Sequence, residues 1–329
     1  MKATTSQFSS RRDFVKRAAL LPFCAATVLS GLSAEAREPV KRAGGAALKV
    51  SLNAFSFNKQ LNDFNLNRGE GVSLMALLDF CAKNNFDAID PTGYFFPGYP
   101  AVPSDDYINT FKRTAFEYGL GISGTGVRNN FTTADKTERA AGVALIKDWV
   151  VVAAKLGAPV IRVFCDTQSR GQGWQDVAKG FTREQVQAWM VDALGECVEA
   201  GKKYGVIIGV QNHGDFILTG EHLLAIVNAV NSDWCGAIVD TGKFVSKDPY
   251  QDIALVAPFA VNWQIKQSPA GADSDVPTDL VKLIRIVRAS GYRGYLPIET
   301  LAPANKVYDP FAVVPPFLKL VREAIAQTA

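Results

Sequence analysis

The strongest constraint on the fold is a strict alternation, from residue 48 to the end, of short apolar runs with amphipathic stretches of helical period. Each apolar run has the length of a buried strand, and a helical pattern follows it. Runs that are apolar throughout are typical of parallel strands covered by helices on both faces. Eight such units are the number that closes into a barrel, so we expect a (β/α)8 barrel of the α/β class. The expected strands are 48–57, 86–90, 121–127, 160–166, 206–213, 236–241, 261–267 and 294–300.

The alternative fold for such a pattern is an open, doubly wound sheet. That fold commonly carries a glycine-rich phosphate loop directly after its first strand. Here the first strand runs instead into the segment Asn-Ala-Phe-Ser-Phe-Asn at 53–58, which contains no glycine. The barrel is therefore the preferred interpretation.

The first 36 residues read as an export signal rather than as part of the fold. The pair Arg11-Arg12, followed by Asp13 and Phe14, resembles the twin-arginine export motif. A modestly apolar stretch follows at 18–32, and Ala34-Glu35-Ala36 supplies small residues at a cleavage site. We expect a twin-arginine signal peptide at 1–36, a polar linker at 37–46 and the barrel at 47–329. The mature protein is then exported, to the periplasm in the simplest case, with no stable membrane span after cleavage.

Charge and cysteine content exclude several classes of protein. The chain carries 35 basic and 32 acidic residues, and the excess lies in the first 36, so the rest of the chain is neutral. A neutral domain has no general attraction for nucleic acid, and two histidines are too few for a repair endonuclease that holds several metals. The cysteines beyond the signal match no metal-binding spacing, so we expect free buried thiols at Cys81, Cys165, Cys197 and Cys235.

Polar residues collect at the ends of four consecutive expected strands, where the site of a (β/α)8 barrel lies. Side chains alternate faces along a strand, so Gln211 shares a face with His213, and Gln264 shares a face with Lys266. Ionisable and amide groups inside apolar strands are costly unless they are paired or bind something, which favours a functional site. The set expected to face one point is Gln211, Asp240, Gln264 and Glu299.

Other strands contribute polar residues to the same end of the barrel. They stand within the first and fourth strands, at the end of the second, and just after the sixth. The residues expected to bind substrate are Asn53, Asp90, Arg162, Gln211, Lys243 and Gln264.

The second half of the chain resembles the xylose isomerase-like TIM barrels, the superfamily of sugar phosphate isomerases and epimerases. Gly-Val-Gln-Asn-His at 209–213 is similar to the Glu-Asn-His motif of its fifth strand, and Ile-Val-Asp-Thr-Gly at 238–242 is similar to its sixth-strand Asp motif. Asn-Trp-Gln-Ile-Lys at 262–266 stands where that family has a His followed by a Lys. The segment 291–299 resembles its eighth strand, which ends in Glu. The resemblance covers the mature chain by topology, and its motifs are specific from about residue 206 onward.

The resemblance implies a divalent metal held by Glu, Asp, His and Glu on strands five to eight. This chain keeps Asp240 and Glu299, whereas Gln211 replaces the first Glu and Gln264 replaces the His. Glutamine offers a metal only a neutral carbonyl oxygen, so this set suits Mg²⁺ or Mn²⁺ better than zinc. The two glutamines contact either such a metal or a sugar hydroxyl.

The same substitutions bear on the mechanism that the resemblance implies. Epimerases of the superfamily use two carboxylates, one on each face of the substrate, and Gln211 cannot act as a base. Glu299 remains as the expected general base. The opposing acid is expected to be His213 or Lys243, and His213 is alternatively a structural residue. Lys266 is expected to stabilise a developing oxyanion, and Lys243 is a second candidate for that role.

Three functions are compatible with these residues. The first is a sugar isomerase or epimerase that transfers a proton next to a carbonyl, and export argues for an unphosphorylated sugar, including oxidised keto-sugars. The second is a lyase or hydratase acting on a keto-glycoside, which needs fewer bases. The third is a periplasmic sugar-binding protein without catalysis. In each case the partner is a small carbohydrate.

Overall fold

The computed structural model describes residues 37–168, 171–271, 274–303 and 306–329. The expected export signal at 1–36 lies outside the described residues. Residues 37–46 lie against the barrel, where the Val40 amide donates to the Pro258 carbonyl at 3.0 Å and the Arg42 guanidinium stacks on the Tyr292 ring. In the described part of the chain, no helix is long and apolar enough to cross a membrane.

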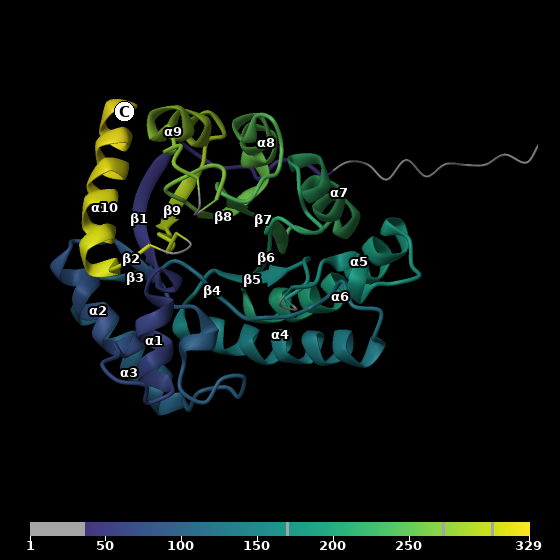
Figure 1. The fold of residues 1–329 in the computed structure, drawn as a ribbon, viewed down its shortest axis with the longest axis horizontal. Helices are drawn as coiled ribbons and strands as arrows, with labels where there is room; N and C mark the ends of the chain where they lie inside the picture. Colours follow the sequence, from purple (N-terminus) through teal and green to yellow (C-terminus); the bar gives the residue numbers. More distant parts are fainter. Residues whose placement is uncertain (1–36, 169–170, 272–273, 304–305) are drawn as a thin grey trace, which may run out of the picture. The chain divides into compact units, whose positions relative to one another are not determined.

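Parallel strands form two curved sheets that share one interior (Figure 1). The strand order is β3-β2-β1-β9 in one sheet and β4-β5-β6-β7-β8 in the other. The strands are β1 (Ala47–Asn53), β2 (Ala88–Asp90), β3 (Gly121–Ile122), β4 (Thr125–Gly126), β5 (Val160–Phe164), β6 (Ile207–Gln211), β7 (Cys235–Asp240), β8 (Ala260–Gln264) and β9 (Arg293–Ile298).

The two sheets meet at two seams, which close the barrel. At the first, β3 and β4 are the two halves of the expected third strand, separated by Ser123 and Gly124. A Cβ on Gly124 would lie 2.7 Å from the Asn262 side-chain nitrogen, which reaches the Ser123 carbonyl at 3.2 Å. Glycine therefore leaves room for a side chain that crosses the interior where the strand changes partners.

The second seam joins β8 to β9 just beyond the end of β8. Ile265 and Ile298 form a parallel bridge. The Ile265 amide donates to the Pro297 carbonyl at 2.8 Å, and the Glu299 amide donates to the Ile265 carbonyl at 2.9 Å. With both seams counted, the eight expected strands build a closed (β/α)8 barrel, and the predicted fold class is confirmed.

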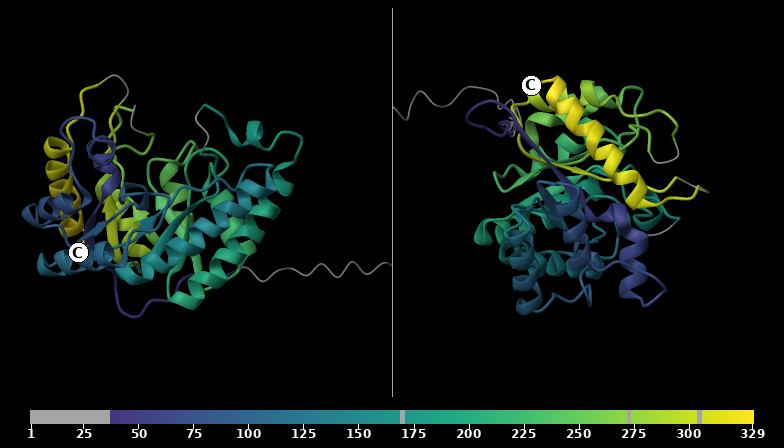
Figure 2. Two further views of the ribbon diagram at one scale, coloured as in Figure 1. Left: turned by 90° about the horizontal axis from the view of Figure 1, so that it is seen from below. Right: turned by 90° about the vertical axis from the view of Figure 1, so that its left-hand side faces the viewer.

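Helices surround the strands, and the loops that follow β5, β8 and β9 gather at one end of the barrel (Figure 2). Side-chain oxygens of Ser73, Ser104 and Thr182 accept backbone N–H groups at the starts of α2, α3 and α6. The helices are α1 (Asn58–Asn65), α2 (Leu74–Lys83), α3 (Asp105–Glu117), α4 (Lys136–Leu156), α5 (Trp174–Val177), α6 (Arg183–Tyr204), α7 (Gly220–Val230), α8 (Pro249–Val256), α9 (Leu280–Ala289) and α10 (Pro310–Gln327), with 3₁₀ turns η2 (Ala54–Phe57), η3 (Gly93–Phe95) and η4 (Ala257–Phe259).

The first strand is shorter than the sequence predicts. It ends at Asn53 rather than at Phe57, because the Asn53 side-chain oxygen accepts the Phe55 amide at 2.8 Å and starts the turn η2. The apolar residues that follow are aromatic and alanine residues of this turn, and their pattern does not distinguish strand from helix over so few positions.

The buried apolar residues form one cluster, and on β1 they alternate with a polar residue that faces the interior. On β1, Val50 and Leu52 are buried toward the helices, whereas Ser51 bonds to Ser123 across the interior at 2.9 Å. The interior is therefore polar toward the carboxyl ends of the strands, where the candidate site lies. The four cysteines in the described residues are free and buried, as expected.

Candidate active site

Polar side chains from strands β6 to β9 meet at the carboxyl ends of the strands. The amide nitrogen of Gln211 donates to Asp240 Oδ2 at 2.8 Å. The Lys266 ammonium lies 3.4 Å from the same Asp240 oxygen and donates to Glu299 Oε1. All four side chains are buried. The parity argument is therefore right for Gln211, Asp240 and Glu299, and Lys266 links the two carboxylates.

The backbone around Asp240 is held by a side chain of the neighbouring strand. Asn212 donates from its amide nitrogen to the Asp240 carbonyl at 2.9 Å and accepts the Asp240 amide at 2.8 Å. Asn129 makes the same pair of bonds to Phe164, at 2.7 and 2.9 Å. At both places an asparagine replaces the backbone partner that a longer strand would supply, so the strand ends carrying the site remain aligned.

Lys266 is positioned from both its backbone and its side chain. Its amide donates to the Thr241 hydroxyl at 2.9 Å, which ties the end of β8 to β7. Burial lowers the pKa of Lys266, but Asp240 and Glu299 outweigh burial, and the pKa stands above its ordinary value. The side chain is therefore a buried cation held between two carboxylates.

Gln264 lies beside this cluster. Its side-chain oxygen accepts a hydrogen bond, whereas the side-chain nitrogen of Gln211 donates one. The Asn53 amide nitrogen donates to Gln264 Oε1 at 2.6 Å, and the Thr92 hydroxyl donates to the Asn53 oxygen at 3.3 Å. Gln211 Oε1 and Gln264 Nε2 are buried without a partner in the structure. Because such groups are costly to leave unpaired, both are suited to bonding a ligand.

A cavity of about 220 Å³ lies over these residues. It combines aromatic rings with two guanidinium groups, and the Arg128 guanidinium stacks on the Tyr94 ring at 4.5 Å. Among the described residues that line it, Glu299 is the one carboxylate. The lining residues are Phe55, Tyr94, Arg128, Arg162, Phe164, Gln168, Gln211, His213 and Glu299.

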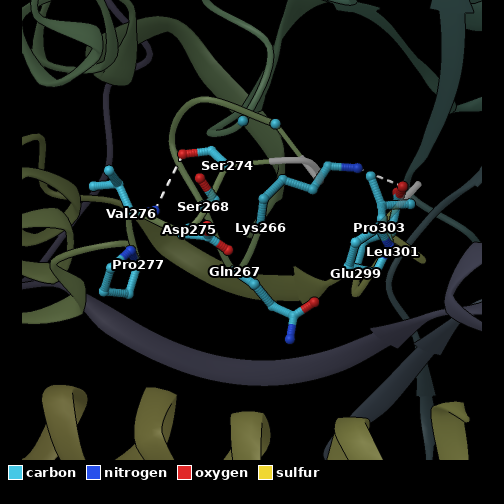
Figure 3. A pocket seen from close by; sticks show the side chains of 12 residues that line it. Lys266, Gln267, Ser268, Ser274, Asp275, Val276, Pro277, Glu299, Leu301 and Pro303 are labelled. Carbon is cyan, nitrogen blue, oxygen red and sulfur yellow. Dashed lines mark hydrogen bonds and ion pairs between the residues drawn. The ribbon is translucent and has the colours of Figure 1, made fainter. Parts of the chain in front are cut away.

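A second cavity, also of about 220 Å³, lies on the other side of Glu299. Figure 3 shows the Lys266 chain extending to Glu299 between the loop at 274–277 and the residues after β9. The two cavities share Glu299, so this buried side chain borders both.

Arg162 and Asp90 are two buried residues of opposite charge, each of which affects the pKa of the other. Burial raises the pKa of Asp90 to about 6, and Arg162 acts in the opposite sense. Asp90 Oδ1 and Arg162 Nη1 are buried without a hydrogen-bond partner. Each of the two residues therefore has one polar atom that could still form a hydrogen bond. Arg162 lines the first cavity, whereas Asp90 does not.

His213 and Lys243 stand at the edge of the site. The His213 ring packs edge-on against Phe164, with centroids 4.9 Å apart. Burial, then Lys243 and Lys266, lower the pKa of His213 to about 3, so the imidazole is neutral at neutral pH. Lys243 lines a neighbouring cavity of about 360 Å³ together with His213. His213 is thus not a charged acid facing Glu299.

The expected metal-ligand set comes together, but its arrangement does not fit a metal. Lys266 already contacts both carboxylates, and Gln211 turns an N–H donor toward Asp240. The Gln264 oxygen is taken by Asn53. Within the described ranges, no group of three or more His, Cys, Asp and Glu residues is placed to hold a metal ion.

Sequence reasoning did not single out Arg128, Phe164 or Gln168, which line the first cavity. Phe164 stands two positions after Arg162, so strand parity alone predicts that both face inward. Arg128 directly follows the expected third strand, and a polar residue at that position is a usable signal. Gln168 lies in the loop after β5, and no pattern in the sequence distinguishes it.

Comparison with known proteins supports the architecture. The family model described as "Xylose isomerase-like TIM barrel" matches residues 78–317. A search of the curated proteins found no match to this chain.

Several solved structures share the fold at low sequence identity. A D-psicose 3-epimerase with D-tagatose from Clostridium cellulolyticum H10 is 15% identical, with a TM-score of 0.66 over 84% of this chain and 99% of that one. A 3-keto-D-glucoside 4-epimerase from E. coli is 13% identical, with a TM-score of 0.66 over 84% and 99%. The IOLI protein, solved with a bound zinc atom, is 15% identical, with a TM-score of 0.64 over 85% and 97%. At these identities the likeness shows a common fold.

Proposed function

Because this chain belongs to the xylose isomerase-like TIM-barrel family, we propose that it is an enzyme that moves a proton next to the carbonyl group of an unphosphorylated sugar. The neighbours of known activity include epimerases of a ketose and of a 3-keto-glucoside, which supports a sugar isomerase or epimerase role. Aromatic rings in the cavity suit the apolar faces of a sugar ring, and the amide of Gln211, whose oxygen has no partner in the structure, suits its hydroxyls.

The observation that carries the proposal is the position of Glu299. Its carboxylate lines the cavity and bonds to the buried Lys266 ammonium. In the proposed reaction Glu299 removes the proton from the carbon beside the carbonyl, and the electron pair of the C–H bond becomes the enolate double bond. The negative charge on the carbonyl oxygen is then stabilised by Lys266.

A lyase acting on a keto-glycoside is the second candidate, and one observation favours it. Glu299 is the only carboxylate among the described residues that line the first cavity, with Gln211 beside it. Inversion at carbon needs a proton donor on the face opposite the base, whereas elimination needs one base and a leaving group. A one-base site is therefore better suited to elimination or to transfer of the proton on a single face.

The proposed reaction is tested by proton exchange in deuterated water, followed by NMR on a panel of keto-sugars and keto-glycosides. The wild type should exchange the proton next to the carbonyl, and Glu299→Gln should lower the rate by at least about 100-fold, the usual contribution of a general base. Glu196→Gln, on the outer face of α6, is the matched control and should retain the rate. A new epimer indicates an epimerase, and a released aglycone indicates a lyase. Sugar binding by calorimetry with no exchange in the wild type would instead identify a binding protein.

We also propose that the protein works outside the cytoplasm, on the strength of the twin-arginine motif at 11–12 and the small residues at 34–36. Cell fractionation with N-terminal sequencing tests this. A mature chain beginning near Arg37 outside the cytoplasm is expected, and a cytoplasmic chain that retains Met1 would contradict it.

A further inference from the structure

We propose that the Lys266 ammonium takes the place of a divalent cation between Asp240 and Glu299, so that the native site works with its own cation and binds no metal there. The inference deepens the proposed function, on which its catalytic part rests. It concerns the charge that stabilises the oxyanion.

The geometry of the ammonium group is the first support. Lys266 Nζ contacts oxygens of both carboxylates, 3.4 Å from Asp240 Oδ2 and in a direct bond to Glu299 Oε1. These are the two acidic residues that remain of the expected metal-binding set. A metal that bridged them would need the same oxygens and would have to displace the ammonium. It would also bring two positive charges next to a third in a buried place.

The two substituted ligands support the same conclusion. Gln211 presents an N–H group to Asp240 Oδ2, so it acts as a donor toward the carboxylate rather than as a ligand beside it. Gln264 uses its oxygen to accept from Asn53 at 2.6 Å. A neutral amide in place of a carboxylate removes one negative charge, so Asp240, Glu299 and the Lys266 ammonium together carry a net charge of only −1, which an added divalent ion would exceed.

The position of the ammonium is fixed rather than adaptable. The Lys266 side chain is 4% exposed and its backbone amide is tied to Thr241 Oγ1. Its head group reaches the Glu299 oxygen at the border of both cavities, as Figure 3 shows for one of them. A carbonyl oxygen that entered beside Glu299 would meet a preorganised cation, which is the requirement for oxyanion stabilisation.

The catalytic step balances without a metal. Glu299 takes the proton from the carbon, the C–H electron pair forms the enolate, and the oxyanion pairs with the Lys266 ammonium. Return of the proton from Glu299 to carbon, or departure of a leaving group from the next carbon with transfer of that proton from Glu299 to it, regenerates both the carbonyl and the Glu299 carboxylate.

The experiment is a Mn²⁺ titration followed by electron paramagnetic resonance, which measures free Mn²⁺ and does not depend on activity. Wild-type protein is expected to leave all Mn²⁺ free up to millimolar concentration. Lys266→Ala removes the ammonium and should bind one Mn²⁺ at least about tenfold more tightly than wild type. Lys243→Ala is the matched control, because Lys243 lines the adjacent cavity without an ion pair to either carboxylate in the structure. In the Mn²⁺ titration this control should give the wild-type result.

The thermal midpoint with and without Mn²⁺ is a second readout, which remains informative if the alanine variant is less stable than wild type. Lys266→Ala leaves two buried carboxylates without their cation, so its thermal midpoint should fall, and Mn²⁺ should raise it again. Lys266→Arg keeps a cation and should neither bind Mn²⁺ nor respond to it. If Lys266→Ala does not fold, Lys266→Gln replaces it in both assays.

Two results would overturn the proposal. One is a wild-type protein that binds one Mn²⁺ and loses it in Asp240→Asn. The other is a folded Lys266→Ala or Lys266→Gln protein that binds Mn²⁺ no more tightly than wild type. Absence of proton exchange in the wild type would contradict only the proposed function. The Mn²⁺ titration would still decide which cation the two carboxylates hold.

Discussion

Replacing Asn212 by alanine should lower the stability of the barrel far more than the loss of one surface amide would. The Asn212 side chain accepts the Asp240 amide and donates to the Asp240 carbonyl, at 2.8 and 2.9 Å. Both residues have no exposed surface. Alanine removes both bonds and leaves two backbone groups buried without partners.

The expected size of the effect follows from those two groups. Each buried polar group left unpaired costs about 1–3 kcal/mol, so the pair costs ~4 kcal/mol in the free energy of unfolding. For a domain of this size that corresponds to a fall in thermal midpoint of about 8–16 °C. Because Asp240 then loses its anchor, the proton-exchange rate should fall as well, even in protein that remains folded.

Urea unfolding followed by tryptophan fluorescence measures the effect. Asn62→Ala is the matched control, because Asn62 is exposed on α1 and its side chain bonds only to the Asn58 carbonyl at 2.7 Å. The control should change the free energy of unfolding by less than about 0.5 kcal/mol. A loss of less than about 1 kcal/mol in Asn212→Ala would refute the view that side chains hold the strand ends together.

Two further predictions concern other parts of the barrel. Burial raises the pKa of Asp166 to about 7, so the folded state keeps this proton at pH values where the unfolded state has released it. The contribution of Asp166 to stability is therefore fully present below about pH 4, falls by up to ~4 kcal/mol between pH 4 and pH 7, and is constant above that. Asp166→Asn should flatten that part of the stability profile in thermal unfolding at several pH values, and an unchanged profile would contradict the assignment. Gly93→Ala should destabilise by about 1–3 kcal/mol, because the new Cβ would lie 2.7 Å from the Gly126 carbonyl and 2.9 Å from the Trp149 ring. Denaturant unfolding with no loss of stability would show that the backbone yields at this turn.

Much of the architecture follows from local pattern. The apolar runs and the helical periods locate the βα units, because parallel strands covered by helices must be apolar along their length. Parity then places Gln211 and Glu299 on the inner face, where the structure has them. Strand lengths are less predictable, as Asn53 shows, because a single side-chain bond ended the strand before its apolar run was finished.

The pairing of the polar side chains could not be predicted in this way. Asn53 bonds to Gln264 across 211 positions of sequence, and Lys266 reaches Glu299 across 33. Such pairs depend on the stagger of strands around the closed barrel, which no local period encodes. The same limitation applies to the metal expected at Asp240, since the ligand types and Lys266 were visible in the sequence but the position of Lys266 between the two carboxylates was not.

The seam between β8 and β9 has a consequence for how such a protein can diversify. Ile265 is bonded on one side to Pro297 and on the other to Glu299, so Lys266 and Glu299 each stand one position beyond a main-chain bridge. The distance between these two residues is therefore set by the backbone of two strands rather than by the loops. Mutation can change the loops around the two cavities while Lys266 and Glu299 stay in register, so ligand recognition can change while this pair does not.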